Sequence, residues 1–237
     1  MAVEGGLGPA LTLAIAEASL ELVPKRLWRH PAVWRNARRR GKKPKHTLLD
    51  ISLHYAAMKE RLEGWERRGR PDITHFILLH ALGSPLSKRG LLRVYVHTIA
   101  NAVIDVKPGT RIPKNYMRFV GLMEQLLVMG RVPQEGEPLL EVVGTGFEDV
   151  MKRVKPTYVV LLSERGSKVR PMELARRLAE HERPLAIVGG FPRGDFSPCF
   201  YQVANEVASL YPEPLEAWVA SSILIHAYEE VLGLYST

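Results

Sequence analysis

Thr157–Phe196 reads TYVVLLSERGSKVRPMELARRLAEHERPLAIVGGFPRGDF, in which a strand, a helix and a second strand lead into a glycine-rich bend. The apolar run TYVVLLSE predicts a buried strand, and PMELARRLAEH predicts a helix that starts at Pro171. LAIVGG predicts the second strand. Strands that alternate with helices form a mainly parallel sheet whose faces the helices cover. We therefore expect an α/β fold with a mainly parallel sheet flanked by helices.

The remainder of the chain adds strands and helices to this pattern. Strands are predicted at LTLAIAE (Leu11–Glu17), ITHFILLHAL (Ile73–Leu82), LLRVYVHT and NAVIDVKP. Helices are predicted shortly after Pro31, from Leu53 to Leu62 behind Asp50 and Ser52 as caps, from about Asn115 to Met129, at FEDVMKRV and at PLEAWVASSILIHAYEEVL. Ile73–Leu82 is assigned to a strand because it is rich in β-branched and aromatic residues. Because the sequence contains no internal repeat, we expect residues 1–237 to form a single domain.

The composition excludes several classes of protein. The 237 residues are 46% hydrophobic and 24% charged, as in ordinary globular proteins. No apolar run reaches the roughly 18 to 20 residues that span a bilayer. The apolar N-terminal segment lacks a basic start and contains Glu4, Glu17 and Glu21, so we expect no signal peptide. A single cysteine, Cys199, excludes an intrachain disulfide and a cysteine-based zinc site. We expect a cytoplasmic protein that does not associate with membranes.

The net charge of +8 is concentrated in clusters. These lie at Trp34–Lys45 (WRNARRRGKKPK), at Arg67–Arg70 and between Arg111 and Arg118. Clustered cations bind nucleic acid well because each phosphate contact releases condensed counterions. The alternative is a general basic bias of the source proteome, which would leave the clusters solvated.

Two segments at predicted strand ends are candidates for a ligand pocket. LLSERG follows the strand that ends near Leu162, and GGFPRGDF follows the strand that ends near Val188. Ligands bind beyond the carboxyl ends of strands in open α/β sheets, and glycines let the main chain approach a ligand closely. SLYPEPLEAW, just before the last helix, could close the same pocket. A purely structural turn explains the glycines almost as well.

Common cofactor and catalytic motifs are missing. The sequence contains no GxGxxG after the first strand, no GxxxxGK[ST], no HExxH and no GxSxG, which argues against a dinucleotide site, a P-loop, a metalloprotease and a hydrolase elbow. We expect no metal site. His75 and His80 are better explained as hydrogen-bonded core residues than as ligands.

Two longer segments carry a family resemblance. RPDITHFILLHALGSPLSKRG and TRIPKNYMRFVGLMEQLL resemble the pseudouridine N1-methyltransferases of small-subunit ribosome biogenesis, a SPOUT-class family called the nucleolar essential protein family in eukaryotes. The resemblance continues through VYVHT, GGFPRGDF and YPEPLEAW and covers nearly the whole chain, which looks like a compact archaeal-type member.

This resemblance implies a C-terminal trefoil knot, a homodimer and a pocket for S-adenosylmethionine, the methyl donor, within about residues 157–220. Residues that match the family's donor-binding positions, or that supply the other walls of its pocket, are Leu162, Gly189, Gly194, Leu210, Tyr211, Pro212, Glu213, Pro214 and Leu215. The glycines in GGFPRGDF would then admit the donor. The implied partners are small-subunit rRNA and a second copy of the chain, with ribosomal proteins or assembly factors as further candidates.

The resemblance also implies an RNA-binding region within about residues 65–130. The family's RNA-contacting basic residues fall on Arg70, Arg111, Lys114 and Arg118. Lys114 replaces a more usual arginine, so it keeps the charge and loses the bidentate fork. Asp72 is expected to orient Arg70, with capping of a helix or turn as the alternative.

The spacing of basic residues around Arg118 suggests an RNA-binding surface independently of the family resemblance. Arg111, Lys114 and Arg118 would share one helical face if a helix began at Arg111. Tyr116 is a candidate for stacking on an unpaired base, whereas Phe119 is expected in the core.

The implied reaction is transfer of a methyl group from a sulfonium to N1 of a pseudouridine. The protein has mainly to align donor and nucleophile while the N1 proton leaves. Asp72 and Asp195 are the nearby carboxylates, and neither is assigned as a base. Two alternatives stay open: a non-catalytic rRNA-binding assembly factor, and a SPOUT methyltransferase for another RNA such as tRNA. A basic metabolic enzyme with a nucleotide pocket has only the glycine loop in its favour.

Overall fold

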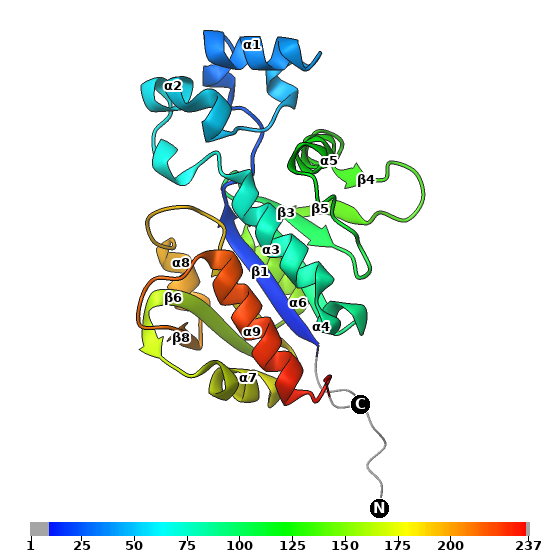
Figure 1. Cartoon of the computed structure of the whole chain (residues 1–237), viewed down its shortest axis with the longest axis vertical. Helices are drawn as coiled ribbons and strands as arrows, with labels where there is room; N and C mark the ends of the chain where they lie inside the picture. The colour runs from blue at the N-terminus through cyan, green and yellow to red at the C-terminus, as the bar shows by residue number, and fades with distance from the viewer. Residues whose placement is uncertain (1–9, 236–237) are drawn as a thin grey trace, which may run out of the picture.

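The computed structural model of the chain describes residues 10–235 (Figure 1). Its strands are β1 (Leu11–Ala18), β2 (Leu92–Thr98), β3 (Ala102–Val106), β4 (Arg131–Val132), β5 (Leu140–Thr145), β6 (Tyr158–Lys168), β7 (Pro184–Gly189) and β8 (Glu206–Ser209). Its α-helices are α1 (Pro31–Arg39), α2 (Ile51–Arg61), α3 (Pro71–Gly83), α4 (Pro85–Lys88), α5 (Tyr116–Met129), α6 (Phe147–Val154), α7 (Pro171–Ala179), α8 (Pro198–Val203) and α9 (Ala217–Val231). Three short 3-10 turns are η1 (Lys25–Leu27), η2 (Pro44–His46) and η3 (Trp65–Arg67).

All the strands belong to one sheet, in the order β4-β5-β3-β2-β1-β7-β6-β8. The strands from β2 to β8 in this order are parallel to their neighbours, whereas β3, β5 and β4 are added antiparallel at the other edge. The predicted α/β class and the mainly parallel sheet are confirmed. The trefoil knot stays a prediction.

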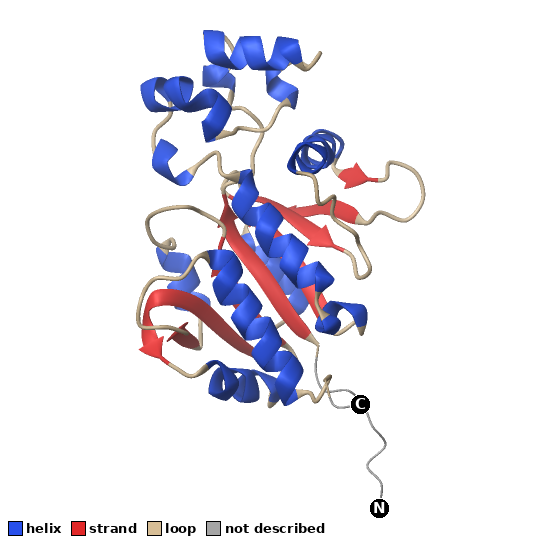
Figure 2. Cartoon of the chain, in the orientation of Figure 1, coloured by secondary structure: helices blue, strands red, loops and turns tan. Residues whose placement is uncertain are grey.

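Helices cover both faces of the sheet. On one face, α3 and α9 lie side by side across β1 (Figure 2) and contact each other. Together with α5 and α7 they bury the larger core, which includes Phe119 and Tyr228. On the opposite face, α6 and α8 bury a second core around Phe147 and Phe200. Burial of this apolar surface is the main force that holds the layers together.

Beyond the carboxyl end of β1, the chain forms a small helical unit of α1 and α2 (Figure 1). Its own apolar cluster contains Val33 from α1 and Met58 from α2. The side chain of Asp50 accepts a hydrogen bond from Ser52 N (2.9 Å), so the predicted cap of α2 is confirmed.

The prediction of a strand at Ile73–Leu82 is wrong, because these residues form most of helix α3. This helix is covered by the sheet, by α5 and by α9, so most of its positions are apolar and no helical period is visible in the sequence. Pro71 at its first position was the available signal of a helix start.

Two further differences concern the strands around the candidate pocket. β6 does not end near Leu162 but continues to Lys168, after an irregularity in which Leu162 and Ser167 both pair with Ala208. The short strand β8 was not predicted, because its four residues are too few for a visible pattern.

Among residues 10–235, no helix combines the length and the apolar character that a membrane crossing requires. Residues 1–9, which open the segment rejected as a signal peptide, lie outside the described part of the chain.

Candidate functional site

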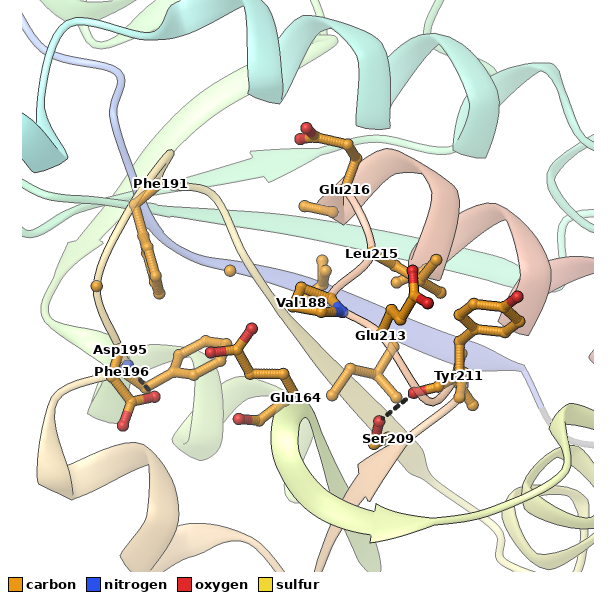
Figure 3. A pocket seen from close by; sticks show the side chains of 18 of the residues that line it. Glu164, Val188, Phe191, Asp195, Phe196, Ser209, Tyr211, Glu213, Leu215 and Glu216 are labelled. Atoms are coloured by element: carbon orange, nitrogen blue, oxygen red, sulfur yellow. Dashed lines mark hydrogen bonds between the residues drawn. The ribbon is translucent and has the colours of Figure 1, made fainter.

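A pocket of about 420 Å³ lies beyond the carboxyl ends of β7 and β8 and beside the irregularity in the middle of β6 (Figure 3). Three segments form its walls: Leu162–Glu164 of β6, the bend after β7, and residues 208–211 and 213–217, which lead into α9. Eight of the nine predicted donor-binding residues line it, namely Leu162, Gly189, Gly194, Leu210, Tyr211, Glu213, Pro214 and Leu215. The topology of the parallel sheet therefore brings together segments that are distant in sequence.

Pro212 is the predicted residue that does not line this pocket. Its carbonyl accepts a hydrogen bond from Lys168 Nζ (2.9 Å), as does the carbonyl of Tyr211 (2.9 Å). The hydroxyl of Ser209 also donates to Tyr211 O (2.9 Å). These bonds tie the segment before α9 to the ends of β6 and β8, and Pro212 contributes to that connection.

The bend after β7 requires glycine at different positions for different physical reasons. A Cβ on Gly190 would lie 2.6 Å from Ala18 Cα, and Gly190 exchanges backbone hydrogen bonds with Ala16 and Ser19 (2.8 Å each). Gly190 is therefore required by the chain's own strand β1. Gly194 has a φ of +87°, in the left-handed region that glycine adopts without strain.

Gly189 faces the pocket beside two aromatic rings. A Cβ there would lie 3.0 Å from the ring of Phe191 and 3.3 Å from that of Phe196. Both phenylalanines line the pocket and were not singled out by the sequence, although they belong to the quoted stretch. A side chain at position 189 would force these rings to move.

Arg67 fixes the bend from outside. Its guanidinium carbon lies 4.3 Å from the centroid of the Phe191 ring, and its Nη2 donates to Glu17 Oε2 (2.9 Å). Glu17 also accepts from the backbone N–H (3.1 Å) and the hydroxyl of Ser197. Arg67 thus connects η3, β1 and the bend in one network of charged and aromatic contacts.

Asp195 has its own set of partners. One oxygen accepts from the Tyr201 hydroxyl (2.6 Å) and from Phe196 N (2.8 Å), and the other lies 2.8 Å from Arg165 Nη1. A carboxylate with this many partners is suited to holding the bend in shape.

The charged side chains that line the pocket are mostly acidic. Glu164, Glu213 and Glu216 are exposed and form no ion pair within residues 10–235 (Figure 3). Among the lining residues that the structure describes, Arg193 is the only cation. This arrangement favours a ligand that carries positive charge beside an apolar part that can contact Leu162, Leu210 and Leu215.

Arg70 and Asp72 form the predicted pair at the start of α3. Asp72 accepts hydrogen bonds from Arg70 Nε (2.8 Å) and Nη2 (2.7 Å). The hydrogen bonds with Asp72 raise the pKa of Arg70, and the charge of Glu216 raises it further. The start of α3 has no side-chain cap hydrogen bond, so of the two roles predicted for Asp72 the structure shows the contact with Arg70 and not the cap. Arg70 and Glu216 precede α3 and α9, two helices that contact each other, and Glu216 also lines the pocket.

Arg111, Lys114 and Arg118 are exposed and form no ion pair within the described residues. They do not share a helical face, because α5 begins only at Tyr116, where the side chain of Asn115 accepts from Arg118 N (3.1 Å). Arg111 and Lys114 lie in the preceding loop.

Histidine and aromatic side chains anchor that loop. His75 Nε2 donates to the carbonyl of Pro113 (2.7 Å), and its ring stacks on the fully buried Phe119 at 4.3 Å. The predictions of a core role for Phe119 and His75 are confirmed, whereas His80 is exposed. The Tyr116 hydroxyl donates to Asp50 Oδ2 (2.6 Å), which gives this ring a structural function.

Comparison with known proteins places this arrangement among methyltransferases. A family model described as EMG1/NEP1 methyltransferase matches residues 13–229. A ribosomal RNA small subunit methyltransferase Nep1 of Staphylothermus marinus is 48% identical over 225 residues, which are 94% of this chain and 97% of that protein. Its counterpart from Thermococcus kodakarensis is 47% identical over 94% of this chain and 100% of its own length.

A solved structure shows the same fold. The crystal structure of Archaeoglobus fulgidus Nep1 bound to S-adenosylhomocysteine has a TM-score of 0.81 and 38% sequence identity with this chain. The likeness covers 95% of this chain and 99% of that one, so it includes both the sheet and the helices around it.

Proposed function

Because the chain belongs to the EMG1/NEP1 methyltransferase family, we propose that it methylates N1 of a pseudouridine in small-subunit rRNA. The methyl donor is S-adenosylmethionine, and the modification takes part in small-subunit biogenesis. One observation carries the proposal: Glu216 of the pocket lining and Arg70, which Asp72 holds, precede two helices, α9 and α3, that contact each other. The methyl donor in the pocket and an RNA bound at Arg70 can therefore meet at the rim of the pocket.

The residues of the pocket fit the proposed donor. S-adenosylmethionine carries a cationic sulfonium and a cationic amine, for which Glu164, Glu213 and Glu216 supply complementary charge. Leu162, Leu210 and Leu215 offer apolar surface to its flat base. Near Gly189 and Gly194, bare main chain can approach it and exchange hydrogen bonds. Bound there, the donor supplies an electrophilic methyl group.

The RNA side of the site is supplied by Arg70, Arg111, Lys114 and Arg118. Asp72 orients the guanidinium of Arg70 toward a phosphate or a base edge. The other three have no acidic partner within the described residues, so their charges are available to phosphates. The target nucleotide must leave its stack to reach the pocket, which favours a loop.

The chemistry requires alignment more than a strong base. The bond from N1 to the methyl carbon forms as the bond from sulfur to that carbon breaks, and the N1 proton passes to solvent. Asp72 is paired with Arg70, and Asp195 is held by Arg165 and Tyr201. Both carboxylates therefore position other groups.

The same proposal extends to organisation and location. The chain acts as one domain, 1–237, with RNA contacts within about 65–130 and the donor within about 157–220. It works in the cytoplasm on pre-ribosomal particles, where ribosomal proteins or assembly factors are further partners. It forms a homodimer through the face shared by α3 and α9, where Phe76 (43% exposed) and Val219 (37% exposed) lie near Trp218.

Methyl transfer to two matched RNA hairpins tests the proposed reaction. One hairpin carries pseudouridine in its loop and the other carries uridine at the same position. In uridine, N1 is bonded to the ribose and cannot accept a methyl group. We expect labelled methyl groups in the pseudouridine hairpin alone, on N1 by mass spectrometry.

The other outcomes point elsewhere. Equal labelling of both hairpins would contradict N1 of pseudouridine as the acceptor, and labelling of tRNA alone would contradict rRNA as the substrate. Donor binding without transfer to any RNA would indicate a non-catalytic assembly factor.

A further inference from the structure

The segment between Glu21 and Asp50 contains ten lysines and arginines and no acidic residue. Arg40 and Lys42 are paired with Glu124. The other eight are exposed and form no ion pair in the described part of the chain; they are Lys25, Arg26, Arg29, Arg35, Arg38, Arg39, Lys43 and Lys45. None of these eight belongs to the RNA-binding set already proposed.

Five of these cations form a compact surface on and just after α1. Arg35, Arg38 and Arg39 are three and four positions apart and so share one face of the helix. Lys43 and Lys45 follow in the adjoining turn. We call these five residues the α1 surface.

The α1 surface is fixed relative to α5 by a buried carboxylate. Glu124 of α5, whose side chain is 2% exposed, accepts two hydrogen bonds from Arg40 (2.7 Å each). It also accepts from Lys42 Nζ (2.5 Å) and from Leu48 N (3.0 Å). Removing a buried charge with this many partners would be costly, so the segment after α1 is held firmly on α5.

A second connection runs from α1 through α2 to the start of α5. Asn36 Nδ2 lies 3.0 Å from His54 Nε2, and His54 Nδ1 accepts from Asp50 N (3.1 Å). Asp50 in turn accepts from the hydroxyl of Tyr116, two positions before Arg118. Two separate sets of hydrogen bonds therefore link the α1 surface to α5, the helix that carries Arg118.

The chemistry of the α1 surface favours a polyanion over a membrane. Val33 and Ala37 of α1 are buried, so Trp34 is the one large apolar side chain that this helix exposes, too little for an apolar face that inserts into lipid. The exposed Trp34 has the guanidinium of Arg38 5.1 Å from the centre of its ring, so a cation covers one face of that ring. Recognition here depends on charge.

We propose that the α1 surface binds the phosphate backbone of the base-paired stem that carries the target loop. This inference rests on the proposed function, since it assigns the stem to α1 and the unpaired nucleotide to the site near Arg70. A paired stem presents phosphates of two strands at high density, which suits fixed cations without stacking groups. The hydrogen-bonded connection to α5 sets the spacing between loop and stem contacts.

The test compares two triple variants that each remove three positive charges. Arg35→Gln/Arg38→Gln/Arg39→Gln alters the α1 surface. Lys88→Gln/Arg89→Gln/Arg93→Gln is the matched control, because these residues are exposed, form no ion pair within the described residues and lie near α4, far from α1 (Figure 1). The probes are a small-subunit rRNA hairpin with a long stem and the same loop on a short stem.

We expect the α1 variant to bind the long-stem hairpin about tenfold or more weakly, with a salt slope shallower by about two to three. Its affinity for the short-stem hairpin should stay within about twofold of the unchanged chain's, and the control should match the unchanged chain on both RNAs. Circular dichroism at 222 nm checks that the variants fold alike.

Three results would overturn the inference: unchanged long-stem binding by the α1 variant, equal losses on both hairpins, and equal losses in both variants. The surface would be assigned to membranes instead if phosphatidylserine vesicles retained the unchanged chain but not the α1 variant, and if the α1 variant still bound RNA like the unchanged chain. Because the readout is binding, stem-dependent binding without methyl transfer would contradict the proposed reaction and still support this inference.

Discussion

Arg70 donates to both oxygens of Asp72. Removing the charge of Asp72 therefore has two opposite effects on RNA affinity, one through the net charge and one through the orientation of Arg70. Removing the negative charge of Asp72 raises the net charge, which alone would strengthen RNA binding. Loss of the hydrogen bonds instead frees the guanidinium to adopt many rotamers, which weakens a directed contact. The sign of the change thus distinguishes a positioning role from a purely electrostatic one.

We predict that Asp72→Asn weakens RNA binding about fivefold, or ~1 kcal/mol, because the local effect is larger. Asp105→Asn is the control, since Asp105 also pairs with a cation two positions later, Lys107, at 2.6 Å. It should leave RNA affinity unchanged or slightly increased. Fluorescence anisotropy with a labelled hairpin measures both, and tighter binding by Asp72→Asn would show that Asp72 does not orient Arg70.

His54, a residue of α2, is fully buried beside Asn36 of α1, and burial lowers its pKa from 6.5 to about 4. As the pH falls, His54 therefore binds a proton near pH 6.5 in the unfolded chain but only near pH 4 in the folded chain. Between these values the unfolded state holds more protons, so stability falls as the pH falls. The contribution of His54 to this loss is at most about 3 kcal/mol.

We predict that His54→Gln unfolds in urea with a weaker pH dependence than the unchanged chain between neutral pH and about pH 5. His80→Gln, at an exposed position, should keep the original dependence. If His54→Gln showed the same slope as the unchanged chain, the histidine would not be held neutral by the fold.

At the scale of the element, the bend after β7 is shaped by contact with β1 as much as by its pocket. Gly190 packs on Ala18 at a distance that no side chain tolerates. Gly121, in the middle of α5, would place a Cβ in open space, with no neighbouring atom within 4 Å. The two glycines therefore offer opposite outcomes for the same substitution.

We predict that Gly190→Ala lowers the free energy of unfolding by about 1–3 kcal/mol, because strand β1 or the bend must shift. Gly121→Ala should raise it by roughly 0.5–1 kcal/mol, because alanine has the higher helix propensity. Urea unfolding followed by circular dichroism measures both. Equal stability of Gly190→Ala and the unchanged chain would mean that the bend does not pack on β1 in solution.

Most elements were predictable from sequence because amphipathic helices such as α6 and α7 show a clear helical period, and because the central strands β1 and β7 are short apolar runs buried on both faces. α3 was not, since its surroundings are apolar on nearly all sides and the period disappears. Likewise, the resemblance grouped Gly189, Gly194 and Leu215 correctly around one pocket. The contacts of Arg67 with Glu17 and of Arg40 with Glu124 span 50 and 84 positions, and no local pattern announces such pairs.

On the scale of the whole molecule, charge is separated. The pocket is lined by carboxylates, whereas cations gather on α1, at the start of α3 and around the start of α5. A cationic donor and a polyanionic RNA are thereby directed to adjacent places on one surface. We propose that the apolar strip of α3 and α9 beside them contacts a second copy of the chain.

We predict that the chain sediments as a dimer and that Phe76→Glu shifts it toward the monomer, because a charge in an apolar interface is costly. Leu53→Glu is the control, since Leu53 is a similarly exposed apolar residue on α2 (37%). Analytical ultracentrifugation distinguishes the species. A monomeric unchanged chain, or a dimer that both variants leave intact, would exclude this face as the interface.

The most direct test of the pocket is a crystal structure of the chain with S-adenosylmethionine. We predict that the ligand lies against Gly189, Gly194 and Leu215, with its sulfonium on the side of the pocket that faces Arg70. Electron density for the ligand at any other place on the molecule would contradict the assignment of the donor to this pocket.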